Sequence, residues 1–211
     1  MATVVLAHGW GCDARLWDAV RARLSSTLHV ETLDFGYFGA ASPAPSFVKP
    51  VIAVGHSLGA LWWLTQDEVR WRRLLCIDGF PRFTATAGYP GIAPRLLERM
   101  RQQFAADPAA VLADFHARCG IPGPSATPDR ARLAAGLAQL TDLDGRAALA
   151  ARKDDVWVLA GTDDPIVPRA LTEAAFAALP AGHVGYVSAP GHALPLTAPE
   201  RCAAWIERLA T

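Results

Sequence analysis

A serine flanked by glycines is the residue best suited to do chemistry in this chain. Ser57 stands in the pentapeptide GHSLG at residues 55–59, between the apolar run 51–54 and a second apolar stretch. A strand, the pattern G-x-S-x-G and a helix together make a nucleophile elbow, which holds the serine in a strained turn at the carboxyl end of a sheet. Glycines two residues to either side leave room for such a turn. The context predicts that Ser57 is a catalytic nucleophile.

A serine hydroxyl needs a neighbouring base to become a good nucleophile, and the chain offers six histidines. His192 follows the last predicted strand, in the turn APGHA at residues 189–193, and so belongs to the carboxyl end of that strand. The others adjoin glycine turns, lie in a predicted helix or fall at the start of a strand: His8, His29, His56, His116 and His183. Position therefore favours His192 as the base.

The base in turn needs a carboxylate behind it. The strand before that of His192 ends in GTDDPIVP at residues 161–168, which offers Asp163 and Asp164. Because two adjacent carboxylates cannot both face one imidazole, we choose Asp164. Asp78, which follows a different strand, is kept as the alternative acid, and its other expected role is to cap a turn.

Two backbone amides are expected to stabilise the oxyanion of a tetrahedral intermediate. One is the amide of Leu58, directly after the nucleophile. The other is the amide of Trp10, in the loop HGWG at residues 8–11 after the first strand. The indole of Trp10 has two further possible roles, lining an acyl pocket and packing in the core.

Alternating strands and helices must position these residues. β-Branched apolar runs predict strands at 3–7, 28–34, 51–54, 73–77, 156–160 and 184–188, and amphipathic stretches predict helices at 13–24, 58–66, 168–179 and 199–209. A loop rich in glycine and proline is expected at 35–47. Repeated strand–helix units predict an α/β fold whose sheet is mostly parallel, with about six strands and helices on both faces. Every candidate residue follows a strand, where such sheets bind ligands.

The alternation stops between residues 80 and 152. Proline and glycine punctuate this segment, and helices are predicted near 94–104, 108–118 and 129–140. We interpret residues 80–152 as a small helical cap inserted over the elbow, and residues 1–79 with 153–211 as the core. Arg95, Arg99 and Gln102 share one face of the first cap helix, which is either an ordinary solvated face or a cationic docking face.

Composition narrows the class of protein. The chain has 211 residues, 52% of them hydrophobic, enough for one domain with a full core. Twenty basic and twenty acidic side chains cancel, so no overall field favours nucleic acid or an anionic membrane as a partner. No apolar run is long enough to span a bilayer. Four scattered cysteines, and a first strand that begins at once, predict a reducing, cytoplasmic location without a leader.

The four motifs HGWG, GHSLG, GTDDPIVP and PGHA, spread over nearly the whole chain, resemble those of the α/β-hydrolases. In that family the acid stands four residues before a proline, which again selects Asp164. Segments 80–92 and 140–146 look similar to the cap of the pimeloyl-ACP methyl ester carboxylesterases of biotin synthesis. The resemblance implies a serine carboxylesterase that needs no metal or organic cofactor and acts on a small-molecule or acyl-carrier-bound ester, with acyl carrier protein as a possible partner. We expect Phe80, Arg95 and Arg99, beside Trp10, to contact that substrate.

Other functions stay open at this point. A generic short-acyl carboxylesterase or thioesterase would use the same residues. A non-catalytic binding module is disfavoured, because the serine, aspartate and histidine are all present. C–C bond hydrolysis or acyl transfer on the same fold is compatible with the sequence, whereas a haloalkane dehalogenase would need aspartate in place of Ser57.

Overall fold

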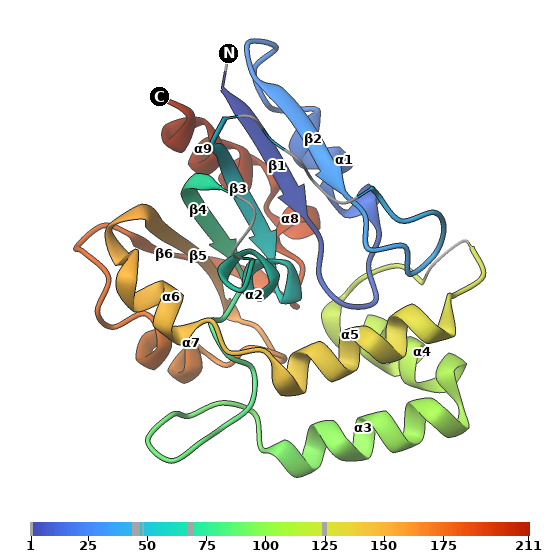
Figure 1. Cartoon of the computed structure of the whole chain (residues 1–211). Helices are drawn as coiled ribbons and strands as arrows, with labels where there is room; N and C mark the ends of the chain where they lie inside the picture. The colour runs from blue at the N-terminus through green and yellow to red at the C-terminus, as the bar shows by residue number, and fades with distance from the viewer. Residues whose placement is uncertain (1, 44–46, 48, 67–69, 124–125) are drawn as a thin grey trace.

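A parallel sheet forms the centre of the molecule. In a computed structural model, which describes residues 2–43, 47, 49–66, 70–123 and 126–211, the strand order is β2-β1-β3-β4-β5-β6 and neighbouring strands pair in parallel (Figure 1). The strands are β1 (Thr3–Ala7), β2 (His29–Leu33), β3 (Val51–His56), β4 (Trp71–Ile77), β5 (Val156–Asp163) and β6 (Val184–Pro190). This confirms the predicted mostly parallel sheet of about six strands.

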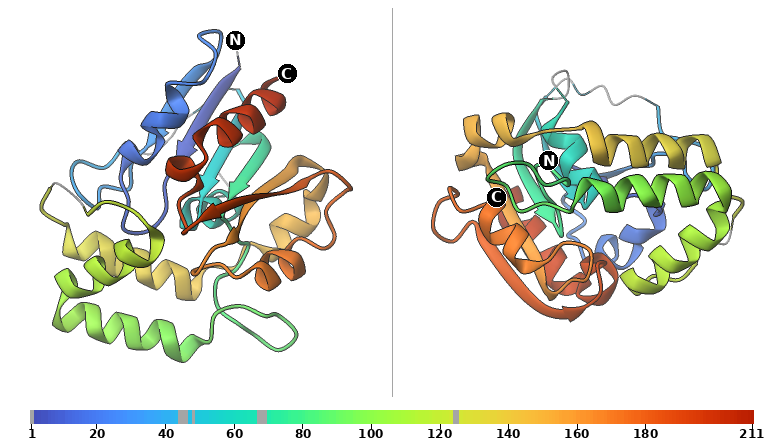
Figure 2. Two further views of the ribbon diagram at one scale, coloured as in Figure 1. Left: turned by 180° about the vertical axis from the view of Figure 1, so that it is seen from behind. Right: turned by 90° about the horizontal axis from the view of Figure 1, so that it is seen from below.

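The helices form three groups around the sheet (Figures 1 and 2). One face is covered by the 3-10 turn η1 (Ala14–Trp17) with α1 (Asp18–Arg21), α8 (Leu194–Thr197) and α9 (Pro199–Ala210). The other face carries α2 (Leu58–Leu64), α6 (Arg146–Ala151) and α7 (Arg169–Ala175). Across the carboxyl ends of the strands lie α3 (Pro94–Ala106), α4 (Pro108–Cys119) and α5 (Arg130–Asp142), and the turn η2 (Lys153–Asp155) leads into β5.

The central strands are buried on both faces, which explains their continuous apolar sequences. Successive side chains of a strand point to opposite faces. In β1, Val4 and Leu6 pack with α1 and α9, while Val5 and Ala7 pack on the side of α2. Every residue of β3 is buried. Full burial of a side chain such as Val or Leu contributes about 1.5–3 kcal/mol, so β1 and β3 anchor the loops that follow them.

The segment between β4 and β5 is helical, as predicted, and its helices begin at recognisable caps. The Asp107 carboxylate accepts a hydrogen bond from the amide of Ala110, and the Asp129 carboxylate accepts one from that of Arg132. The structure adds α6, which was not predicted. Leu149 of α6 packs with the side chains of α2 and the sheet, so the last turns of this segment pack on the core side.

Two predicted helices are shorter than expected. The stretch 13–24 forms η1 and the four-residue α1, because the amides of Arg23 and Leu24 bond three residues back and tighten the chain into a turn. The helix expected at 168–179 ends at Ala175. The loop expected at 35–47 falls partly outside the described residues, which omit 44–46. Among the residues that are described, no helix is both long and apolar enough to cross a bilayer.

Candidate active site

The turn between β3 and α2 holds Ser57 in a backbone conformation that few residues other than glycine adopt. Its φ is 53° and its ψ is −120°, a strain of about 1–3 kcal/mol that the surrounding packing must offset. A Cβ at Gly59 would collide with the carbonyl oxygens of Ala7 and His8. A Cβ at Gly55 would collide with the backbone of α2. The two glycines therefore let the turn pass close to β1, and Ser57 is almost fully buried at its apex.

Ser57, His192 and Asp164 form a continuous hydrogen-bonded chain. The Nε2 atom of His192 lies 2.8 Å from the hydroxyl of Ser57, and its Nδ1 atom lies 2.6 Å from Oδ2 of Asp164. The other oxygen of Asp164 accepts from the amides of Ile166 and Val167. With Nδ1–H donating to the carboxylate, Nε2 is left to accept the serine proton. The arrangement can therefore act as a general base on the Ser57 hydroxyl.

The electrostatic environment favours the protonated form of His192. Burial alone would lower its pKa, because it disfavours the charged imidazole. The charge and hydrogen bond of Asp164, together with the charge of Asp78, outweigh burial and raise the pKa of His192 above its usual value. A base with a raised pKa binds the serine proton more tightly once it has taken it.

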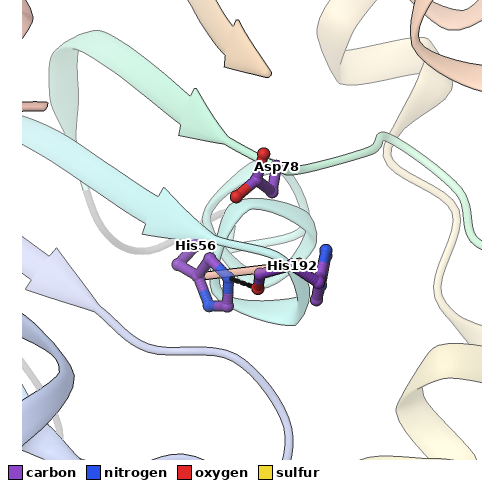
Figure 3. A group of neighbouring side chains, drawn as sticks. All are labelled: His56, Asp78 and His192. Carbon is purple, nitrogen blue, oxygen red and sulfur yellow. Dashed lines mark hydrogen bonds between the residues drawn. The ribbon is translucent and has the colours of Figure 1, made fainter. Parts of the chain in front are cut away.

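Three parts of the protein hold the backbone around His192. Figure 3 shows the imidazole of His56, at the end of β3, donating from Nε2 to the carbonyl of His192 over 2.8 Å. Asp78, which follows β4, accepts from the amides of Gly161 and Leu194. The amide of His192 donates to the carbonyl of Cys119, the last residue of α4, over 3.1 Å. The base is thus fixed by its backbone as well as by its ring.

Potential metal-ligating atoms of His56, Asp78 and His192 lie within 4.8 Å of one another. Hydrogen bonds already occupy Nε2 of His56, both oxygens of Asp78 and both ring nitrogens of His192. Burial, followed by the charge of His192, holds the pKa of His56 well below its usual range, so its ring stays neutral. We therefore assign this group to positioning His192.

The candidate acids differ in what they contact. Asp164 is the one bonded to the imidazole. Asp163 is exposed, and its carboxylate accepts from the hydroxyl of Thr162. Asp78 has a positive φ of 47° and its oxygens are bonded to backbone amides, and burial raises the pKa of its carboxyl. The geometry favours Asp164 as the acid and gives Asp78 a turn-capping contact.

The amides predicted to bind an oxyanion are available. Within the described residues, neither the amide of Trp10 nor that of Leu58 donates to another protein group. His8 orients the first of them. Its Nδ1 atom donates to the carbonyl of Gly9 over 2.9 Å, since a carbonyl oxygen can only accept, and its Nε2 atom faces the amide of Phe35 and the carboxylate of Asp34. That carbonyl and the Trp10 N–H belong to one peptide plane, so His8 fixes the direction of the N–H.

A pocket of about 910 Å³ opens on Ser57 beneath helices α3 and α4. Its wall is mainly apolar, formed by Trp10, Phe83, Ile92, Leu96, Leu97, Met100, Val111, Phe115, Leu140 and Ile166. Charged and amide side chains of α3 and α4 also line it: Arg99, Gln103, Asp107, Asp114 and Arg118. Such a pocket suits an apolar chain that ends in a polar group.

Of the four residues expected to contact substrate, two line this pocket and two do not. Trp10 and Arg99 line the pocket. Phe80 does not line it: its side chain is completely buried and packs against Phe83, with ring centroids 4.8 Å apart. Arg95 is exposed and also lies outside the lining. Phe80 comes three residues after the end of β4 and joins a buried apolar cluster, so its contact with substrate stays a prediction.

Sequence reasoning missed the wall that α4 contributes. Val111, Phe115 and Arg118 line the pocket at spacings of four and three residues, so they share one face of α4. That periodicity was visible in the sequence, but nothing local to α4 indicated that this face would turn towards Ser57 rather than towards the core.

The sequence model of the alpha/beta hydrolase family matches residues 4–205, almost the whole chain. The chain belongs to the alpha/beta hydrolase family. This alpha/beta hydrolase is similar to the pimeloyl-[acyl-carrier protein] methyl ester esterase of Aromatoleum aromaticum, with 30% identity over 97% of this chain and 96% of the relative. The enzyme of the same name from Aliivibrio fischeri is 29% identical, over 78% of this chain and 76% of the relative.

Solved structures confirm the fold of this alpha/beta hydrolase. An esterase from Exiguobacterium antarcticum superposes with a TM-score of 0.81 at 18% identity, over 99% of this chain and 90% of that one. A thermophilic esterase from Thermogutta terrifontis gives 0.77 at 20% identity, over 100% and 91%. The predicted α/β-hydrolase fold is therefore correct.

Proposed function

We propose that this alpha/beta hydrolase is a serine carboxylesterase that works through an acyl-enzyme. The observation that carries the proposal is the chain of short contacts from Ser57 through His192 to Asp164, at the mouth of an apolar pocket. Ser57 is the nucleophile, His192 the general base and acid, and Asp164 the group that orients His192 and stabilises its charged form.

Each step of the proposed reaction uses one of these groups. His192 takes the hydroxyl proton as Ser57 attacks the ester carbonyl, and the amides of Trp10 and Leu58 bind the resulting oxyanion. Removing one such donor costs roughly 10²–10³ in kcat. His192 then protonates the departing alcohol, and water cleaves the acyl-enzyme by the same sequence of proton transfers. These residues complete the hydrolysis without a metal or organic cofactor.

The proposed substrate is the methyl ester of a pimeloyl group on acyl carrier protein, in biotin synthesis. Two observations support it: the names of the relatives, and a mainly apolar pocket whose lining includes Arg99 and Arg118 as well as Asp107 and Asp114. Arg99 lines that pocket and Arg95 lies on the exposed surface of the same helix, where both can meet phosphate or carboxylate groups of a carrier. A generic short-acyl carboxylesterase or thioesterase is the alternative.

The proposal also covers the division of the chain into a cap and a core, and its location in the cell. Residues 80–152 act as the cap and residues 1–79 with 153–211 as the core. The four cysteines are free and buried, which suits the reducing, cytoplasmic location that the sequence predicts.

Labelling with a fluorophosphonate tests the nucleophile. We expect one label per chain on Ser57 and none in Ser57→Ala, because, among the serines that the structure describes, Ser57 is the one with an imidazole at hydrogen-bonding distance. The exposed and remote Ser25→Ala serves as the control and should label normally. Full labelling of Ser57→Ala at another residue would contradict the assignment.

Substrate choice needs a second measurement. Methyl pimeloyl-acyl carrier protein should be hydrolysed with a higher kcat/KM than p-nitrophenyl esters of two to eight carbons. A preference for the shortest p-nitrophenyl ester, with no turnover of the carrier-bound ester, would favour the generic esterase.

A further inference from the structure

Helix α4 of the cap contacts both loops that carry the proposed catalytic groups. His116 donates from Nε2 to the carbonyl of Gly11, in the loop of Trp10, over 2.7 Å. One turn later, the carbonyl of Cys119 accepts from the amide of His192 over 3.1 Å. Residues three apart lie on the same side of a helix, and the rise between them is about 4.5 Å. One rigid turn of α4 therefore spans the two loops.

The contact on the oxyanion side is buried and specific. The side chain of His116 is 4% exposed. Gly11 has a φ of 68°, a conformation that turns the chain directly after Trp10. The same loop is held again by the cap, since the indole of Trp10 donates to the carbonyl of Leu133 over 2.8 Å and its ring packs edge-on against Phe115. The loop of Trp10 is thus tied to α4 and α5.

The contact between α4 and the turn of His192 is also tightly packed. Gly191 has a φ of 84°, and a Cβ at this position would collide with the carbonyl of Cys119. The end of α4 is itself closed, because Gly120 adopts a φ of 72° and the amide of Ile121 donates back to the carbonyl of His116 over 3.0 Å. The carbonyl that holds His192 therefore belongs to a defined helix terminus.

We propose that α4 sets the spacing between the oxyanion loop and the catalytic base, and that His116 is a positioning residue in that role. The inference rests on the proposed function, because it takes the Trp10 amide as an oxyanion donor and His192 as the base. A misplacement of about 1 Å can cost 10²-fold in rate even when it originates away from the chemistry. Loss of the His116 bond frees the Gly11 carbonyl, two peptide units after the Trp10 N–H, and so loosens the loop that carries this donor.

Three substitutions at one position test the bond. The amide nitrogen of glutamine reaches about as far as Nε2 of histidine, whereas that of asparagine is shorter, and phenylalanine has no donor. We expect His116→Phe and His116→Asn to lower kcat for a p-nitrophenyl ester and the rate of fluorophosphonate labelling about tenfold, a partial share of the cost of losing a donor. KM should change little. His116→Gln should recover most of both rates.

A control separates positioning from general stability. Leu112→Ala, a buried α4 residue outside the pocket lining, should lower Tm while leaving kcat at 25 °C close to that of the unaltered protein. Two results would overturn the proposal: unchanged kcat and labelling in His116→Asn, or no difference between the asparagine and glutamine variants. If phenylalanine prevents folding, the asparagine–glutamine pair still decides. Failure of the unaltered protein to hydrolyse esters or label at Ser57 would instead contradict the proposed function.

Discussion

The turn that holds Ser57 and the pocket wall built by α3 and α4 fix their residues in different ways. At the turn, backbone sterics dominate: a φ of 53° at Ser57 is enforced by close approaches at Gly55 and Gly59. The wall consists of side chains at helical spacing, and several of them are exposed, among them Leu96 at 54%. The turn therefore has one permitted geometry, and the wall can vary in side chain and shape. Substitutions in the first region should have large, all-or-none effects, and those in the second should be graded.

After loss of the nucleophile, the largest loss of activity is expected at Asp164, the acid of the hydrogen-bonded chain that begins at the Ser57 turn. Asp164→Asn should lower kcat by on the order of 10⁴, because the amide disturbs the imidazole tautomer that leaves Nε2 free to accept. Asp163→Asn should stay near the unaltered protein, since that side chain is exposed and does not contact His192. Kinetics with a p-nitrophenyl ester measure both. A large loss in Asp78→Asn alone would move the acid to the other strand.

A smaller effect is expected in the pH dependence of kcat/KM, which reports on the protonation of His192. His192 must be neutral to take the serine proton, so kcat/KM should fall about tenfold per pH unit below its pKa. Because that pKa is raised, the fall should begin above pH 6.5. Asp78→Asn removes one of the charges that raise it, so the acid limb should move to lower pH. An acid limb that moves to higher pH in this variant would contradict the electrostatic account.

The smallest effect is expected for the arginines of α3. Arg95→Ala with Arg99→Ala should raise KM for an acyl-carrier substrate roughly fivefold, as expected for about 1 kcal/mol from exposed charge contacts. KM for a p-nitrophenyl ester should change less, and the difference should shrink with added salt. Arg99→Ala should account for more of the change than Arg95→Ala, because only Arg99 lines the pocket. The exposed Arg201→Ala on α9 is the matched control.

If the double variant Arg95→Ala with Arg99→Ala changed KM equally for both substrates, the face that carries these arginines would be an ordinary solvated surface. The contrast between turn and wall would then hold for geometry but not for substrate choice. The single variants sharpen this outcome, since a change confined to Arg95→Ala would place the carrier contact outside the pocket.

Features with local sequence signals could be predicted, whereas contacts between segments far apart in the chain could not. The strands and the elbow were predictable because their signals are local: apolar runs, two glycines around Ser57, and aspartates directly after strands. The contact between His116 and Gly11 joins residues 105 apart, and no pattern within either segment indicates it. The sequence neighbours of Phe80 likewise do not reveal that its ring packs against that of Phe83. α6 is six residues long, too short for a clear apolar period.

The contacts of α4 have a consequence for recombining parts of related proteins. An exchange of helices between β4 and β5 treats the cap as a replaceable lid, yet its helix α4 also holds the turns that follow β1 and β6. A transplanted lid would have to present a donor to Gly11 and a carbonyl to the amide of His192. The practical unit of exchange is therefore the lid together with those two turns.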